Sequence, residues 1–199
     1  MKPQLMTDPG IEMALRLRRA CEAHESELGS HLTNVARYTA ELARHIGLSD
    51  AFVADLHYAT PLHDLGKIAV PLELLRRPGA LTHEEMELVK EHTVVGHRIL
   101  QGSEWPVIRY AANIALSHHE NWDGTGYPHG LSGESIPIEA RLCALADVYD
   151  ALRSRRSYKR PWPEQEVIHE LRRLSGTKFE PRLVEAFLEL IPRLEASAA

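Results

Sequence analysis

The segment IEARLCALADVYDAL, residues 138–152, is apolar around almost its whole circumference when it is wound as an α-helix. A helix without a broad polar face must be surrounded by other elements, so this segment is predicted to be the buried central helix of the domain. Asp147 interrupts the apolar surface, and the small residues beside it permit close approach by neighbours. A buried aspartate needs a partner, and a cation is the strongest available.

Helical patterns continue on both sides of this segment. Apolar residues recur at helical spacing, and turn and capping residues separate the runs. Thr82 and Glu85 have the spacing of a capping box, Ser49 or Asp50 is placed as the N-cap of a helix, and Gly47 is placed to end one. The further predicted helices cover residues 11–25, 30–46, 50–65, 82–100, 105–118, 163–174 and 180–194.

The chain shows no alternating strand pattern, internal repeat, low-complexity tract or linker. These patterns predict an all-α bundle of about seven to nine helices that forms a single domain. Within it, residues 1–26 are expected to form an N-terminal helical segment, and residues 27–195 the body of the domain.

The composition restricts the functions that are open to the protein. The 199 residues, 44% hydrophobic and 26% charged, are sufficient for one globular core. No apolar run approaches the roughly 20 residues that span a bilayer, and the N-terminus lacks the apolar core of a signal peptide. Two cysteines fit a reducing compartment, so we expect a cytoplasmic protein without membrane contact. The net charge of −5 argues against binding of a nucleic-acid polymer.

Histidine is unusually frequent, with 12 residues in the chain, and it is the commonest metal ligand in proteins. Most single histidines on helices are surface or capping residues. His63–Asp64 and His118–His119 are adjacent pairs at predicted helix ends, and His92 lies within a helix. Together with Asp147 they are hard to explain as surface residues. A mixed imidazole and carboxylate set suits iron, manganese or zinc rather than magnesium or calcium. The histidines interpreted as ordinary are His24, His45, His57, His83, His97, His129 and His169.

Six stretches carry a resemblance to a known family. The His-Asp pair of HDLGK resembles the signature of the HD-domain metal-dependent phosphohydrolases. The glycine-rich stretch after it resembles the signature of the HD-GYP branch, whose members degrade cyclic di-GMP. The motifs stand in the family's order over about residues 27–190, and the resemblance implies an all-helical HD-domain bundle. The stretches are ELGSH (27–31), HDLGK (63–67), KEHTVVGHRIL (90–100), HHENWDGTGYPHGLSGESIP (118–137), ARLCALADVYDAL (140–152) and SGTKFEP (175–181).

The resemblance also implies a set of metal ligands. One metal would be held by His31, His63, Asp64 and Asp147, and a second by Asp64, His92, His118 and His119. Some family members hold a third metal through a glutamate four residues before the first histidine, and Glu27 stands at that spacing, on the same helical face as His31. The implied cofactors are two or three divalent ions, iron or manganese in the first place and zinc or nickel otherwise.

The implied reaction is hydrolysis of cyclic di-GMP to linear pGpG and, in a further step, GMP. Two metals about 3.5–4 Å apart share a hydroxide that attacks phosphorus. Lys67 resembles the family lysine that contacts the phosphate. Arg156 and Lys159, in the basic stretch RSRRSYKR (153–160), match family positions that bind substrate phosphate and guanine. Three neighbours depart from the usual family pattern, and they leave substrate identity less settled than the chemistry: Arg153, Arg155 and Ser157.

Two alternatives stay open. The same centre could hydrolyse a mixed cyclic GMP–AMP dinucleotide, or the chain could be a non-catalytic module that senses a cyclic dinucleotide or docks on a signalling protein. The filled ligand positions and Lys67 favour an enzyme. The Gly126-Tyr127-Pro128 loop implies contact with a diguanylate cyclase or another signalling partner, and a homodimer is left open. Asp123, Tyr127 and Pro128 are interpreted as structural.

Overall fold

The computed structural model describes residues 8–24, 29–154 and 161–196. This part of the chain is helical, and an isolated bridge between Ser175 and Phe179 is its only β-type pairing. The all-α class is confirmed. The elements are α1 (Pro9–His24), α2 (Gly29–His45), α3 (Asp50–Ala59), η1 (Thr60–Leu62), η2 (Leu65–Ala69), α4 (Leu72–Leu75), α5 (His83–Leu100), α6 (Pro106–Ser117), η3 (Gly133–Ser135), α7 (Ile138–Arg153), α8 (Glu164–Leu174) and α9 (Pro181–Ala196), where η denotes a 3₁₀ turn.

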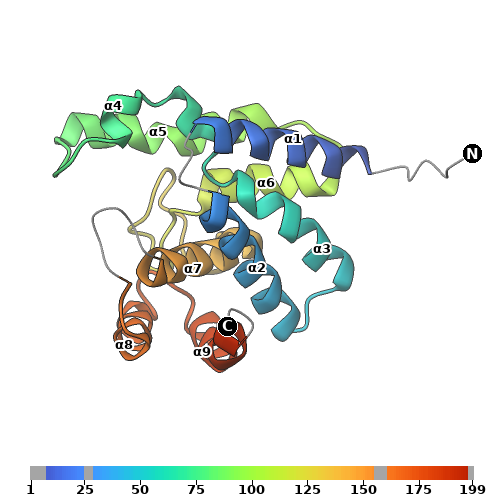
Figure 1. Ribbon diagram of the computed structural model, residues 1–199, viewed down its shortest axis with the longest axis vertical. Helices are drawn as coiled ribbons and strands as arrows, with labels where there is room; N and C mark the ends of the chain where they lie inside the picture. The colour runs from blue at the N-terminus through green and yellow to red at the C-terminus, as the bar shows by residue number, and fades with distance from the viewer. Residues whose placement is uncertain (1–7, 25–28, 155–160, 197–199) are drawn as a thin grey trace, which may run out of the picture.

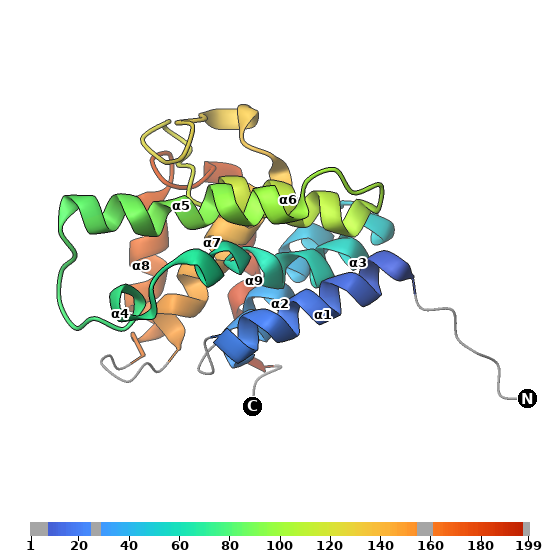
Figure 2. The same ribbon diagram turned by 90° about the horizontal axis from the view of Figure 1, so that it is seen from above.

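Helix α7 lies at the centre of the bundle, as its apolar circumference predicts (Figure 1). It packs against α2, α6 and α8, while α3 and α9 add to the same core around α2. Its Leu142, Leu145 and Tyr149 are completely buried. The Tyr149 ring makes edge-to-face contacts with Tyr38 and Phe187, with ring centroids 5.0 Å and 4.9 Å away. Figure 2 shows α5 and α6 along one side of the molecule, with the glycine-rich loop beyond them.

The local signals at helix ends are confirmed. Gly47 has a φ of 81°, a left-handed conformation that ends α2 and favours glycine. The Ser49 side chain accepts a hydrogen bond from the Phe52 amide at the start of α3. The capping box of Thr82 and Glu85 is formed at the start of α5.

The third helix ends earlier than its sequence pattern predicts. We expect it to continue to about Gly66, whereas α3 ends at Ala59 and two 3₁₀ turns follow. Pro61 has no amide hydrogen to donate to a carbonyl four residues back, so the α-helix cannot continue regularly through it. His63 and Asp64 consequently lie in the short link between η1 and η2 rather than on a helix.

Gly66 allows this link to lie directly against α5. A Cβ atom at Gly66 would be 1.9 Å from the carbonyl oxygen of His92 and 2.6 Å from the amide nitrogen of Gly96. No side chain fits there, because real Cβ contacts are never that short. Gly66 therefore allows Asp64 to lie next to His92 of α5.

No helix among the described residues combines the length and the apolarity that crossing a membrane requires.

Candidate metal centre

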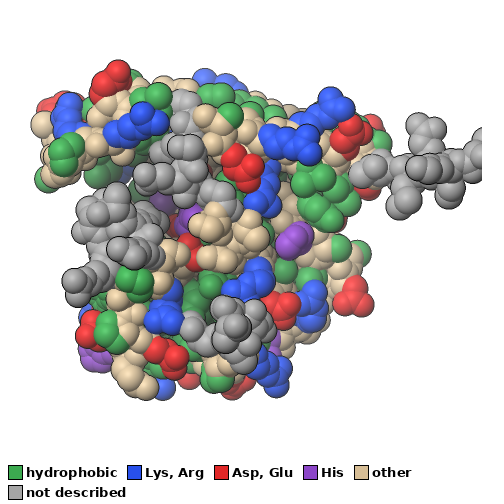
Figure 3. All heavy atoms as spheres, viewed as in Figure 1, with side chains coloured by type: hydrophobic (Ala, Val, Ile, Leu, Met, Phe, Trp, Pro, Cys, Tyr) green, Lys and Arg blue, Asp and Glu red, His purple; other side chains and the backbone are tan. Residues whose placement is uncertain are grey.

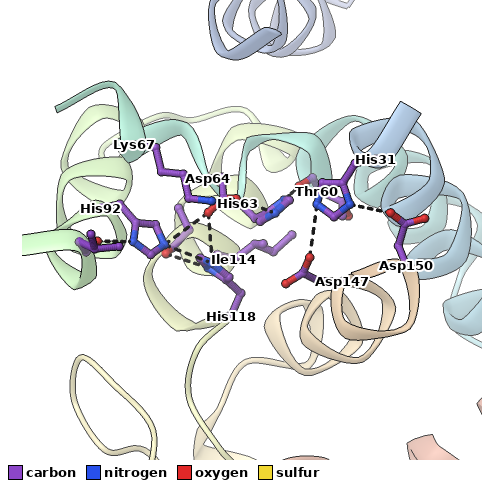
Figure 4. A network of polar contacts seen from close by, with 12 residues as sticks. His31, Thr60, His63, Asp64, Lys67, His92, Ile114, His118, Asp147 and Asp150 are labelled. Atoms are coloured by element: carbon purple, nitrogen blue, oxygen red, sulfur yellow. Dashed lines mark hydrogen bonds and ion pairs between the residues drawn. The ribbon is translucent and has the colours of Figure 1, made fainter. Parts of the chain in front are cut away.

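Seven of the predicted ligand residues converge from five places in the chain. They come from α2, from the link between η1 and η2, from α5, from the end of α6 and from α7. They form two groups, and within each group the candidate ligand atoms all lie within 4.8 Å of one another. In Figure 4, Asp64 lies between His92 and His118 on one side and His31 and Asp147 on the other. The first group is His31, His63 and Asp147, and the second is Asp64, His92, His118 and His119.

The Asp64 carboxylate joins the two groups. Its Oδ2 is 3.3 Å from Nε2 of His63, while its Oδ1 is 3.4 Å from Nε2 of His92 and 3.7 Å from Nε2 of His118. Burial alone would raise the pKa of Asp64, but Lys67 and His63 outweigh it and hold that pKa well below its usual value. Asp64 is therefore ionised and presents one oxygen to each group, which is the arrangement of a bridging ligand.

Three of the histidines are oriented by backbone carbonyls. Because a carbonyl only accepts, the Nδ1 of each ring carries the hydrogen, and the neutral ring has its lone pair on Nε2, the atom that faces Asp64. Nε2 of His63 is buried 3.3 Å from Oδ2 of Asp64 without regular hydrogen-bond geometry, an unfavourable condition that a cation bound to both atoms would relieve. The Nδ1–carbonyl pairs are His63 with Thr60 at 3.0 Å, His92 with Val89 at 2.7 Å and His118 with Ile114 at 3.0 Å.

His119 is held in a different way, by the glycine-rich loop. Its ring stacks on Tyr127 with centroids 4.8 Å apart and an interplanar angle of 27°. The Tyr127 amide donates to the carbonyl of His119 at 3.2 Å. A Cβ at Gly126 would be 2.5 Å from that same carbonyl oxygen, so only glycine permits this approach. Tyr127, interpreted from the sequence as structural, thus contacts a candidate ligand directly.

Asp150 belongs to the site, although sequence reasoning missed it. Its Oδ2 accepts a hydrogen bond from Nδ1 of His31 at 2.7 Å, which leaves Nε2 of His31 facing Asp147 at 3.3 Å. Asn34 and Ser154 donate to the same carboxylate at 2.9 Å and 3.0 Å. The sequence offers one signal for it, since Asp150 follows Asp147 by one helical turn.

Asp147, expected from the sequence to be buried, is half-buried and less enclosed than Asp150. Its side chain is 23% exposed, whereas that of Asp150 is 1% exposed. Asp147 opens toward the interior of the site, and Asp150 is the carboxylate that is enclosed. A buried carboxylate must be hydrogen-bonded to be tolerated, which the three donors around Asp150 provide.

Changing Asp150 to asparagine tests this orienting role. The amide keeps the size of the side chain but removes the charge that favours Nδ1–H of His31 over the other tautomer. We expect the first group to bind metal about 10–100-fold more weakly, the usual effect of losing such a partner. Chelator competition measures it, with the exposed Asp50→Asn as control. Equal affinities for both variants would contradict the role.

The two groups differ in how firmly they hold protons. Burial alone lowers the pKa of His31, but hydrogen bonds to Asp147 and Asp150 raise that pKa to about 9. Burial lowers the pKa of His118 well below its usual value and lowers that of His119 to about 3. At neutral pH, His31 is protonated in the metal-free protein, and the histidines of the second group are ready to bind a cation.

Metal binding should therefore release a proton from one group and none from the other. A cation entering the first group must displace the His31 proton, so its affinity should rise with pH up to about 9, by at most about tenfold per unit. Titration calorimetry in buffers of different ionisation enthalpy measures the released proton. Two binding steps that both leave the buffer heat unchanged would contradict the assignment.

Lys67 lies at the edge of the centre. Its Nζ donates to Oδ2 of Asp64 at 2.6 Å, and its side chain is 25% exposed. It is thus not a solvated cation at a helix end. Histidine and acidic side chains are also visible in a hollow of the surface near this region (Figure 3). Three further predicted site residues lie outside the described part of the chain: Glu27, Arg156 and Lys159.

The fold and the site together define a class, the helical proteins that gather histidine and aspartate from several segments into a metal site. Within that class, this chain belongs to the HD domain family, whose model matches residues 15–183. The resemblance indicated by the motifs is thereby confirmed.

Several characterised relatives are similar over most of this chain. A cyclic di-GMP phosphodiesterase of Thermotoga maritima is 45% identical, covering 87% of this chain and 47% of that protein. The 3'3'-cGAMP-specific phosphodiesterase 2 of Vibrio cholerae is 43% identical over 89% of this chain and 34% of its own length. The cyclic di-GMP phosphodiesterase response regulator RpfG of Xanthomonas campestris is 43% identical, with 92% and 49% covered. The chain thus spans half or less of the length of these relatives.

Solved structures share the fold. A cyclic GMP-AMP specific phosphodiesterase of V. cholerae superposes with a TM-score of 0.65 at 21% identity, over 94% of this chain and 50% of that one. The HD domain of the Listeria monocytogenes phosphodiesterase PgpH gives a TM-score of 0.63 at 17% identity, over 92% and 99%. At these identities the likeness concerns the fold alone.

Proposed function

We propose that this chain is a metal-dependent phosphodiesterase that hydrolyses cyclic di-GMP to linear pGpG, with GMP as the alternative end product. The observation that carries the proposal is the Asp64 carboxylate, which presents one oxygen to each of two histidine-rich groups. That geometry suits a pair of cations sharing a ligand, the arrangement used for in-line displacement at phosphorus. The 45% identity to a cyclic di-GMP phosphodiesterase supports the choice of substrate.

The donor set fits iron or manganese, with zinc or nickel as alternatives, because it combines neutral imidazoles with carboxylates. When bound, two such cations supply a water of lowered pKa and offset the negative charge of a phosphate. Glu27 would serve a third ion. The residues proposed to hold the first ion are His31, His63, Asp64 and Asp147, and those for the second are Asp64, His92, His118 and His119.

Lys67 has a double role in this proposal. In the structure its ammonium neutralises part of the Asp64 charge at 2.6 Å. When that charge is balanced by bound cations instead, the ammonium can donate to a phosphate oxygen of the substrate and offset charge that grows during cleavage. Arg156 and Lys159 are proposed to bind substrate phosphate and guanine.

A second substrate has support of its own. The chain is 43% identical to a 3'3'-cGAMP-specific phosphodiesterase, so cyclic GMP–AMP is the alternative on the same centre. A sensing module that binds without cleavage is the remaining possibility. Docking of a diguanylate cyclase or similar partner on the Gly126-Tyr127-Pro128 loop, and a homodimer, are proposals that a pull-down and a sedimentation experiment would test.

The deciding experiment is digestion by protein purified anaerobically and loaded with iron or manganese. Cyclic di-GMP and 3'3'-cGAMP are supplied separately, and the products are separated by chromatography. We expect pGpG from cyclic di-GMP, faster than any product from 3'3'-cGAMP, and no product from metal-free protein. Faster cleavage of 3'3'-cGAMP would identify the alternative enzyme, and binding of either nucleotide without cleavage would identify a sensing module.

A further inference from the structure

Lys178 lies in the turn between α8 and α9 and is not one of the candidate metal ligands. This turn is closed by the Ser175–Phe179 bridge. Its backbone pairs with the loop that follows His119, because the Trp122 amide donates to the carbonyl of Lys178 at 3.1 Å. The Asp123 amide donates in the same way to the carbonyl of Thr177 at 2.9 Å. These two hydrogen bonds hold the turn that carries Lys178 against the residues that follow His119.

The ammonium of Lys178 is half-buried and lacks a carboxylate partner among the described residues. Its one hydrogen bond there is a long contact of 3.4 Å to the side-chain oxygen of Asn121. The two other lysines in the described part of the chain are both ion-paired, Lys67 to Asp64 and Lys90 to Glu87, at 2.6 Å each. A partly desolvated cation without an anion is unfavourable, so an anionic ligand would be stabilised here.

The Lys178 ammonium lies beside the segment that carries His119. Its Nζ is 3.4 Å from the side-chain oxygen of Asn121, which is two residues beyond His119. Burial lowers the pKa of Lys178, and the Asp147 carboxylate works against that change. Lys178 is thus held toward Asn121, within electrostatic reach of Asp147.

We propose that Lys178 binds the phosphodiester of the substrate that is not being cleaved. The inference rests on the proposed function, since it requires a substrate with two phosphodiesters, which a cyclic dinucleotide has. Lys67, paired with the Asp64 carboxylate, is placed for the phosphate that reacts. Lys178, on a separate segment at the edge of the centre, is placed for the second one. It would make the enzyme select cyclic dinucleotides over substrates that contain a single phosphodiester.

The test compares Lys178→Met with Lys178→Arg on metal-loaded protein and two substrates. Methionine keeps an unbranched side chain but removes the charge, including its contact with the Phe179 ring. We expect the KM for cyclic di-GMP to rise about tenfold, the scale of one charge-assisted hydrogen bond. The value of kcat and the metal content should stay near those of wild type. Cleavage of bis(p-nitrophenyl) phosphate, which has one phosphodiester, should be unaffected, and arginine should restore the low KM.

The control is Arg44→Met, which removes an exposed, ion-paired cation at the end of α2 and should leave the KM for cyclic di-GMP unchanged. An unchanged KM in Lys178→Met, or an equal loss on both substrates, would overturn the role of Lys178. The proposed function fails separately, if wild-type protein cleaves bis(p-nitrophenyl) phosphate but neither binds nor cleaves a cyclic dinucleotide. In that case the protein would have no substrate with a second phosphodiester for Lys178 to bind.

Discussion

Asp64→Ala is expected to abolish hydrolysis and to leave neither group able to retain its metal. The reason is geometric, because the two oxygens of this one carboxylate face His63 on one side and His92 and His118 on the other. Removing it takes a negatively charged ligand from both cations at once. The ligands that remain are the histidines and the single carboxylate of Asp147, which cannot balance the charge of two divalent ions.

Bound metal and turnover should be measured in the same preparation of Asp64→Ala. We expect bound metal to fall from about two ions per chain to below one, and turnover to fall to background. Asp50→Ala, which removes an exposed aspartate at the start of α3, is the control for handling and should keep both properties. Full metal occupancy together with retained turnover would rule out the bridging role.

Lys67→Ala should have the second largest effect, and it should lower the rate of cleavage without removing the metals. Its ammonium is 2.6 Å from the Asp64 carboxylate, so it is close to where a reacting phosphate would lie but supplies no lone pair to a cation. We expect metal content to be kept and kcat to fall roughly 10²–10³-fold, the usual loss of one charge contact in a transition state. Substrate binding should change little.

Steady-state kinetics on metal-loaded protein, with metal analysis of the same sample, separates this effect from loss of the centre. Lys67→Arg is a useful companion, because it keeps the charge while altering the geometry, and should recover part of the rate. Unchanged turnover of Lys67→Ala at saturating substrate would mean that Lys67 serves only to balance the charge of Asp64. The contrast with Lys178, expected to change KM and not kcat, tests both assignments together.

Local chemistry explains which features could be predicted. The helices follow from apolar periodicity, and their ends from Gly47, Ser49 and the Thr82–Glu85 box, all of which act within a few residues. The apolar pattern predicts an end of α3 that is too late, because Pro61 interrupts the helix although the pattern continues beyond it. Helix α4 escaped prediction because four residues are too few to show a period.

The amino-acid sequence by itself determined the all-α class, the central position of α7 and the residues able to hold metals. Only the tertiary structure decided how those residues are grouped, since His31 meets Asp150 across 119 positions and Lys178 meets Asn121 across 57. It also decided that Asp150, and not Asp147, is the enclosed carboxylate. The physical reason is how far apart in the chain the interacting residues are. Periodicity and capping depend on neighbours along the chain, whereas burial, tautomer and charge balance depend on neighbours that folding brings together.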